Sequence, residues 1–290
     1  MPQRFLITGA TGNVGKAVLK HLDALTHDHT VVAGLRDLEK EREALAQYPD
    51  LELVHFDFEK PETYAEALAE VDCVFLLRPP QIADVDGVFA PLIDAMQQAG
   101  AKRVVFLSVQ GVERSSVIPH HKIEKLIEKT DLAYIFLRPS YFMQNLTTTL
   151  AKDLKEHREI LLPAGSARFL WVDVDNIGEV GAHMMLQFDQ YVGQKPEITG
   201  QELFNFYEVA AQINQVVDNP IRYRAVGPLR FWWIKRQRGQ GQAMILVMIM
   251  LHFLPRFQKD PAVSDFYEKL TGKKPTSLHS FIEREQAALA

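Results

Sequence analysis

The chain has 290 residues, of which 47% are hydrophobic and 24% are charged, and its formal net charge is −5. This hydrophobic fraction excludes a disordered chain, and 16 glycines and 15 prolines are too few for a collagen-like or low-complexity protein. The negative net charge excludes a nucleic-acid-binding protein that depends on bulk positive charge.

Short apolar runs alternate with helical spacing through the first half of the chain. Six runs predict buried strands, over residues 4–8, 30–35, 51–56, 71–77, 103–107 and 133–137. The intervening segments predict helices, over residues 13–25, 38–48, 61–69, 83–99 and 119–129. This alternation predicts right-handed βαβ units and a doubly wound parallel sheet with helices on both faces.

The alternation weakens after Pro139, and the rest of the chain predicts a smaller, mostly helical lobe. The expected elements are a helix with an aspartate cap over residues 175–186, an edge strand over 195–200, a helix over 204–217, a strand over 221–226 and helices from 228 onward. We therefore expect a large α/β domain over residues 1–155, with further pieces from 168–200, and a C-terminal lobe over 201–290.

Features tied to cellular location point to the cytoplasm. The single cysteine, Cys73, cannot form an internal disulfide, and the first residues show no signal-peptide pattern. The longest apolar run, residues 243–254, is shorter than the roughly 20 residues that a spanning helix needs. We expect a cytoplasmic chain with no membrane span.

Three glycines follow the first predicted strand at Gly-x-x-Gly-x-x-Gly spacing. Gly9 permits a tight turn, Gly12 lets backbone N–H groups approach a pyrophosphate, and Gly15 lets the first helix pack closely on the sheet. The N-terminus of that helix adds partial positive charge. A structural turn without a ligand is the alternative, but the position in the first βαβ unit favours dinucleotide binding.

Several stretches of the chain resemble the NmrA-like group of atypical short-chain dehydrogenases/reductases. They are TGATGNVG (8–15), LRD (35–37), LLRPP (76–80), RVVFLSVQG (103–111), LRPSYFMQN (137–145), WVDVDNIG (171–178) and LTGKKPTSLHSF (270–281). The resemblance implies an NAD(P)-binding Rossmann sheet with a smaller substrate lobe. The group contains NADPH-dependent quinone and phenylpropanoid-type reductases, and also redox-sensing regulators that bind the dinucleotide without turning it over.

The residue after the second strand bears on the choice of dinucleotide. NAD-binding sites carry an acidic residue in this region to bind the ribose hydroxyls, whereas this chain has Arg36. A planar guanidinium suits a 2′-phosphate, so we predict that NADP(H) is preferred over NAD(H). In the alternative interpretation Arg36 is a solvated charge and Asp37 binds the ribose.

Further cofactor contacts are predicted at the carboxyl ends of the strands. The resemblance puts Asp57 and Phe58 beside the adenine, although Asp57 can equally cap the next turn. Arg78 can reach a phosphate or an anionic substrate group, or lie at the surface. The full predicted set of cofactor-binding residues is Gly9, Thr11, Gly12, Asn13, Val14, Gly15, Arg36, Asp57, Phe58, Leu77, Arg78, Pro79 and Ser108.

The catalytic pair of the wider superfamily is missing. Catalytic members use Tyr-x-x-x-Lys in the helix after the fifth strand, and the resemblance aligns His120 with that tyrosine and Glu124 with that lysine. Two interpretations follow. In the first, His120 or Lys122 acts as proton donor or oxyanion partner; in the second, the site binds NADPH and catalyses little. Reduction of a quinone does not require a proton donor on the protein, because hydride transfer to a quinone is favourable and the proton can come from solvent.

The predicted substrate-binding residues follow the fifth and sixth strands or lie in the C-terminal lobe. They are Gln110, Tyr141, Phe142, Met143, Asn145 and Trp232. Aromatic and thioether groups among them suit a flat apolar substrate, although core packing explains such residues too. We assign no metal site, because the short His27-Asp28-His29 spacing offers no adequate set of ligands.

Together these features predict an NADPH-binding oxidoreductase that reduces a quinone-like or other small carbonyl compound by hydride transfer. The alternative is a non-catalytic NADP(H)-sensing protein that acts through a protein partner. The absence of the tyrosine argues against a third hypothesis, in which the chain is a sugar-nucleotide epimerase. We expect a small-molecule substrate. The partner of the chain is either a second copy of itself in a homodimer or a regulatory protein, and the sequence does not distinguish the two.

Overall fold

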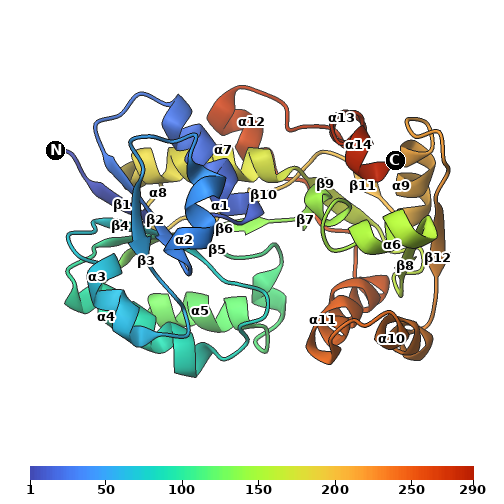
Figure 1. The fold of residues 1–290 in the computed structure, drawn as a ribbon, viewed down its shortest axis with the longest axis horizontal. Helices are drawn as coiled ribbons and strands as arrows, with labels where there is room; N and C mark the ends of the chain where they lie inside the picture. Colours follow the sequence, from blue (N-terminus) through green and yellow to red (C-terminus); the bar gives the residue numbers. More distant parts are fainter. The chain divides into compact units, whose positions relative to one another are not determined.

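Two units make up the fold, and the computed structural model describes them over residues 1–290 (Figure 1). Unit 1 comprises Met1–Pro139 and Val174–Ile198, and unit 2 comprises Ser140–Asp173 and Thr199–Ala290. Each unit thus combines two separate segments of the chain. None of the helices is both long enough and apolar enough to span a bilayer.

Unit 1 is built on a seven-stranded parallel sheet with the order β10-β6-β5-β4-β1-β2-β3. Its strands are β1 (Arg4–Ile7), β2 (Thr30–Leu35), β3 (Glu52–His55), β4 (Cys73–Leu77), β5 (Arg103–Leu107), β6 (Ala133–Pro139) and β10 (Glu197–Ile198). The first six strands have the order of doubly wound dinucleotide-binding sheets, which confirms the predicted fold class. The predicted edge strand is also confirmed, as β10 pairs with β6 at the end of the sheet.

Helices cover both faces of this sheet (Figure 1). They are α1 (Asn13–Ala24) and α7 (Val174–Leu186) on one face, and α3 (Tyr64–Ala67), α4 (Ala90–Gln98) and α5 (Pro119–Ile127) on the other, with α2 (Leu38–Glu41) and α8 (Phe188–Tyr191) as short additions. Alternate strand residues such as Leu6 and Phe106 form one core cluster with Met96 and Ile123. On the other face α1 and α7 lie so close that a Cβ on Gly178 would be 2.4 Å from the Ala17 Cβ.

Several predicted helices are shorter than expected. The prediction over residues 38–48 is wrong beyond Glu41, where the chain continues as a 3₁₀ turn, Arg42–Leu45. Only Leu45 in these two elements is buried, so little packing holds a longer helix in place. A 3₁₀ turn (Pro61–Thr63) likewise precedes α3, and a π turn (Val85–Phe89) precedes α4.

Unit 2 contains two small sheets and several helices. Its strands are β7 (Tyr141–Phe142), β9 (Phe169–Val172) and β11 (Leu203–Phe204) in one sheet, and β8 (Glu159–Leu162) with β12 (Arg222–Ala225) in the other. Its helices are α6 (Ala151–His157), α9 (Phe206–Ile213), α10 (Pro228–Gln237), α11 (Gln242–Phe253), α12 (Phe266–Thr271), α13 (Leu278–Arg284) and α14 (Gln286–Leu289). Short 3₁₀ turns lie at Met143–Asn145 and Leu254–Phe257 here and at Val112–Arg114 in unit 1.

The core of unit 2 contains a buried pair of polar side chains. The His252 Nδ1–H donates to the Met248 carbonyl at 2.7 Å, so its Nε2 accepts from the Tyr141 hydroxyl at 2.9 Å. Burial lowers the pKa of His252 to about 4 and raises the pKa of Tyr141. The histidine is therefore neutral at physiological pH and serves as a hydrogen-bonding group within an aromatic core.

Candidate functional site

The glycine loop joins the carboxyl end of β1 to the N-terminus of α1. Gly9 has a φ of +60°, a conformation that side-chain-bearing residues rarely adopt. A Cβ on Gly15 would lie 2.2 Å from the Gly9 carbonyl oxygen, so only glycine fits where the helix begins. The Gly12 N–H donates to the same carbonyl at 3.0 Å, which closes the turn.

The first turn of α1 is left open to an anion. Gly12 occupies the N-cap without any side-chain hydrogen bond, and the first turn has no acidic residue. Asn13 is exposed and Val14 is buried, so this end of α1 presents a polar side chain and backbone N–H groups. An uncapped helix N-terminus below a tight loop suits a diphosphate by both hydrogen bonding and charge.

Thr8 fixes the end of β4 next to this loop. Its hydroxyl donates to the Phe75 carbonyl at 2.9 Å and accepts from the Leu77 N–H at 2.9 Å. The Leu77 side chain lies beside Gly9, where a Cβ would be 3.1 Å from the leucine Cδ2. The predicted contact residues Gly9 and Leu77 are thus neighbours at the carboxyl edge of the sheet, and Pro79 follows on the loop after β4.

The turn after β2 carries an acidic residue that the sequence analysis missed. The Glu41 carboxylate accepts from the Thr11 hydroxyl at 3.0 Å and from the N–H groups of Arg36 and Asp37 at 2.9 and 3.1 Å. Asp37 caps α2 and pairs with Lys40 at 2.7 Å, which lowers the pKa of that carboxyl group. The Arg36 side chain is exposed and makes no hydrogen bond or ion pair, so it is free to meet a ligand.

The two predicted adenine contacts after β3 also have partners within the fold. One Asp57 oxygen accepts from the Glu59 N–H at 3.0 Å, so Asp57 does cap the following turn. Its other oxygen lies 4.0 Å from the Lys60 ammonium. Phe58 is buried, with its ring 4.9 Å from Phe56 and 5.7 Å from Phe89, so most of its surface belongs to the core.

Arg78, on the loop after β4, is neither a surface arginine nor free. Its guanidinium donates to the Ile82 carbonyl at 2.6 Å and to the Pro79 carbonyl at 3.1 Å, which holds the loop in shape. Its Nε–H donates to the His120 Nε2 at 3.4 Å, which leaves the imidazole proton on Nδ1. Burial, together with the Arg78 charge, lowers the pKa of His120 to about 3.

The remaining candidates on α5 point to different roles. Lys122 is exposed, and residues two apart on a helix do not share a face, so it does not act with His120. Glu124 is buried and receives two hydrogen bonds from Arg138 of β6, at 2.7 and 3.1 Å. The position that resembles the family's catalytic lysine is therefore used to tie α5 to the sheet.

Two polar residues follow β5 at the same edge. Ser108 is buried, and its hydroxyl oxygen has no hydrogen-bond partner within the protein. An unsatisfied buried hydroxyl is costly, so a ligand that pairs with it would gain affinity. Gln110 is half-buried and donates to a Glu197 carboxylate oxygen at 2.9 Å.

The other predicted substrate residues lie in unit 2. Tyr141 and Met143 are buried in its core cluster, with the Tyr141 hydroxyl on His252. Phe142 and Asn145 are half-buried, and Trp232 on α10 is 38% exposed. Phe142, Asn145 and Trp232 therefore have surface left for a ligand, whereas Tyr141 and Met143 belong to the core of unit 2.

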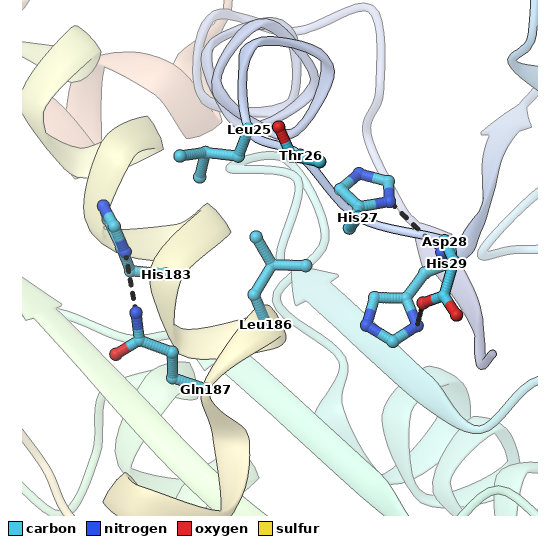
Figure 2. A pocket seen from close by; sticks show the side chains of 8 residues that line it. All are labelled: Leu25, Thr26, His27, Asp28, His29, His183, Leu186 and Gln187. Atoms are coloured by element: carbon cyan, nitrogen blue, oxygen red, sulfur yellow. Dashed lines mark hydrogen bonds and ion pairs between the residues drawn. The ribbon is translucent and has the colours of Figure 1, made fainter. Parts of the chain in front are cut away.

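A pocket of about 360 Å³ lies elsewhere in unit 1 (Figure 2). It is bounded by the C-terminal ends of α1 and α7 and by the segment before β2, so it lies at the edge of the sheet opposite to the glycine loop. The lining residues are Leu25, Thr26, His27, Asp28, His29, His183, Leu186 and Gln187. No group of three or more His, Cys, Asp or Glu side chains is placed to hold a metal ion.

Residues 1–280 of the chain match the protein-family model described as the NmrA-like family. The chain belongs to the NmrA-like family. It is 28% identical over 276 residues to prestalk A differentiation protein A of Dictyostelium discoideum, covering 95% of this chain and 90% of that protein. It is 26% identical over 287 residues to an NAD(P)H azoreductase of Xenophilus azovorans, covering 98% of each.

Solved structures of similar fold include two reductases. The triphenylmethane reductase of Citrobacter sp., complexed with NADP(H), superposes with a TM-score of 0.83 at 22% identity, covering 97% of this chain and 99% of that one. An NADPH-dependent quinone oxidoreductase of Escherichia coli, complexed with NADPH, also gives 0.83, at 19% identity over 97% and 99%. At this identity the likeness establishes the fold that the NmrA-like chain shares with them.

Proposed function

We propose that this NmrA-like chain is an NAD(P)H-dependent reductase that transfers hydride to a quinone-like or other small conjugated carbonyl compound. The observation that carries the proposal is the glycine loop, which packs so closely on the first turn of the uncapped helix α1 that Gly15 has no room for a Cβ. The family match supports it, as do the activities for which the azoreductase, the triphenylmethane reductase and the quinone oxidoreductase are named.

The residues present fit a bound dinucleotide. Backbone N–H groups at the start of α1 would hold the diphosphate, and the Arg36 guanidinium would meet a 2′-phosphate, which favours NADP(H) over NAD(H). The unpaired Ser108 hydroxyl would donate to the nicotinamide end. Bound NADPH would supply a hydride and become NADP⁺, and the acceptor would take one proton from solvent.

His120 contributes an N–H rather than an acidic proton. With a pKa of about 3 it is neutral at pH 7, so it does not deliver a proton as imidazolium. Its Nδ1–H would instead donate a hydrogen bond to the oxygen that gains charge on the acceptor. A neutral His120 is sufficient for an acceptor that is easily reduced. For such an acceptor, the orientation of the substrate against the nicotinamide supplies most of the rate enhancement.

We further propose that Phe142 and Trp232 supply apolar contacts to the substrate. Trp233 on α10 and Met250 on α11 are also exposed, at 56% and 53%, so unit 2 offers apolar surface to a flat conjugated molecule. Trp232→Ala should raise KM for a quinone with little change in the affinity for NADPH. An unchanged KM would remove Trp232 from the substrate site.

The decisive experiment combines binding with turnover. Calorimetric titration with NADPH measures binding, and NADPH absorbance measures consumption over a panel of quinones, azo dyes and triphenylmethane dyes. Turnover of one acceptor class supports the proposal and names the substrate. Tight binding with no turnover on any acceptor would instead support a dinucleotide sensor, and no binding of either coenzyme would refute both functions.

The preference for NADP(H) has its own test. Arg36→Ala should weaken NADPH binding about tenfold, or about 1.4 kcal/mol, and leave NADH binding unchanged. Arg42→Ala is the matched control, because it removes an exposed positive charge from the same short segment. If Arg36→Ala leaves the ratio of the two affinities unchanged, the assignment of Arg36 is wrong.

A further inference from the structure

The Glu41 carboxylate occupies a small set of donors at the edge of the glycine loop. The Thr11 hydroxyl donates to one oxygen at 3.0 Å, and two successive N–H groups, of Arg36 and Asp37, donate to the other at 2.9 and 3.1 Å. Glu41 is half-buried, and its neighbour Lys40 pairs with Asp37 rather than with it. The carboxylate thus accepts hydrogen bonds from two backbone groups and one hydroxyl.

These donors lie where the adenosine ribose of a dinucleotide belongs. In doubly wound folds the residue after the second strand contacts the ribose 2′ position, and here that turn supplies the Arg36 and Asp37 N–H groups. The same donors would suit the oxygens of a 2′-phosphate, but a carboxylate already fills them. Two anions cannot share one set of donors without strong repulsion, because the charges would lie within a few ångströms.

A carboxylate and a hydroxyl are compatible in the same place. A carboxylate only accepts hydrogen bonds, so Glu41 can accept from the 2′- and 3′-hydroxyls of NADH, whereas a phosphate dianion has no proton to donate to it. The exposed Arg36 side chain acts in the opposite direction, since a guanidinium favours the phosphate. The turn therefore carries one residue that favours each coenzyme.

We propose that Glu41 is a specificity-determining residue that lowers the preference of this chain for NADPH over NADH, by competing with the 2′-phosphate for Thr11 and the β2–α2 turn. This inference rests on the proposed dinucleotide-binding function. For NADPH to bind fully, the Glu41 side chain must leave its three donors. For NADH it can stay and accept from the ribose.

The test is Glu41→Gln, which keeps the size of the side chain and removes its charge. We expect the Kd for NADPH to fall at least tenfold and the Kd for NADH to change less than threefold, as measured by calorimetry. Glu43→Gln is the matched control, because Glu43 is exposed, lies two residues away and makes none of these contacts. It should leave both constants unchanged.

A second measurement isolates the 2′ group from the rest of the coenzyme. Adenosine 2′,5′-bisphosphate and adenosine 5′-monophosphate differ only there, and Glu41→Gln should tighten the bisphosphate alone. Glu41→Ser, whose side chain is too short to reach the donors, should shift selectivity in the same direction. A role confined to holding the turn would instead weaken all four ligands alike.

The outcomes separate this inference from the function beneath it. If the unaltered chain binds neither coenzyme, the dinucleotide function fails and the inference fails with it. If both coenzymes bind but Glu41→Gln and Glu41→Ser leave their ratio unchanged, or shift it toward NADH, the function stands and the role of Glu41 is refuted.

Discussion

Gly15→Ala is the sharpest test of the glycine loop. The added Cβ would lie 2.2 Å from the Gly9 carbonyl oxygen and 2.8 Å from the Ala10 Cα, both of which are backbone atoms. Ordinary contacts are about 3.5 Å, so α1 or the loop must move by roughly 1 Å. No rotation of a side chain relieves this overlap.

The helix has little room to retreat. On its other side α1 meets α7, where a Cβ on Gly178 would be 2.4 Å from the Ala17 Cβ. Forced overpacking of this kind costs about 1–3 kcal/mol. A shift of this size also displaces the N–H groups that would hold the diphosphate, so we expect NADPH affinity to fall at least tenfold.

Urea unfolding measures the first effect and calorimetric titration with NADPH the second. Gly227→Ala serves as control, since a Cβ there meets nothing within 4 Å, and its cost should stay below about 1 kcal/mol. A Gly15→Ala protein with unaltered stability and affinity would refute the steric argument. Lost stability with full affinity would show that the loop does not hold the coenzyme.

Three further predictions concern stability and binding. Glu124→Gln removes the buried charge partner of the Arg138 guanidinium, which donates to Glu124 at 2.7 and 3.1 Å, and leaves it only the exposed Glu113 at 3.3 Å; this should cost about 3 kcal/mol in urea unfolding, and a loss below 1 kcal/mol would contradict it. The folded pKa of His252, about 4, lies below its unfolded value, so stability is full above pH 6.5 and falls as the pH drops toward 4. Between pH 7 and 5 the free energy of unfolding of the natural protein should therefore fall by about 2 kcal/mol more than that of His252→Gln. Equal decreases would argue against a buried neutral imidazole. Ser108→Ala should leave the free energy of unfolding unchanged or raise it by up to about 2 kcal/mol, because it removes a buried hydroxyl without a partner, yet it should weaken NADPH binding several-fold.

The parallel sheet is the part of the fold that local pattern determines best. Each strand of the βαβ repeats is a short apolar run, and the structure has strands within or overlapping all six predicted runs. The edge strand β10 was also predictable, because Pro196 directly before it is tolerated at an edge. These features depend on residues close together in the sequence.

Four of the five strands of unit 2 were missed for the opposite reason; the fifth, β12, lies within the strand predicted over residues 221–226. β8 (Glu159–Leu162) pairs with β12 more than 60 residues later, and β9 pairs with β11 more than 30 residues later. Both β8 and β9 are buried throughout, so neither shows the alternation that marks a half-exposed strand. Their existence depends on distant pairing, which a local pattern does not contain.

The residues of the candidate site also fall into those that local sequence predicts and those that depend on distant partners. The glycine loop follows from spacing alone, since three glycines at a strand–helix junction need only their own segment. The roles of Glu41 and Arg78 need partners 30 and 42 residues away, at Thr11 and His120. An acidic residue one helical turn beyond Asp37 was the available signal for Glu41, but it does not reveal which donors the carboxylate reaches.

The positions that resemble the superfamily's tyrosine and lysine bear on the proposed reaction. His120 accepts from Arg78 and has a pKa of about 3, so it supplies no acid at neutral pH. Glu124 is bound by Arg138 and supplies no positive charge to a ribose. Reduction of an unactivated ketone, like epimerisation of a sugar, needs a positioned proton donor or acceptor, whereas a quinone accepts hydride readily and is protonated by water. The absence of both groups at these positions therefore supports the proposal of an easily reduced acceptor over either of those reactions.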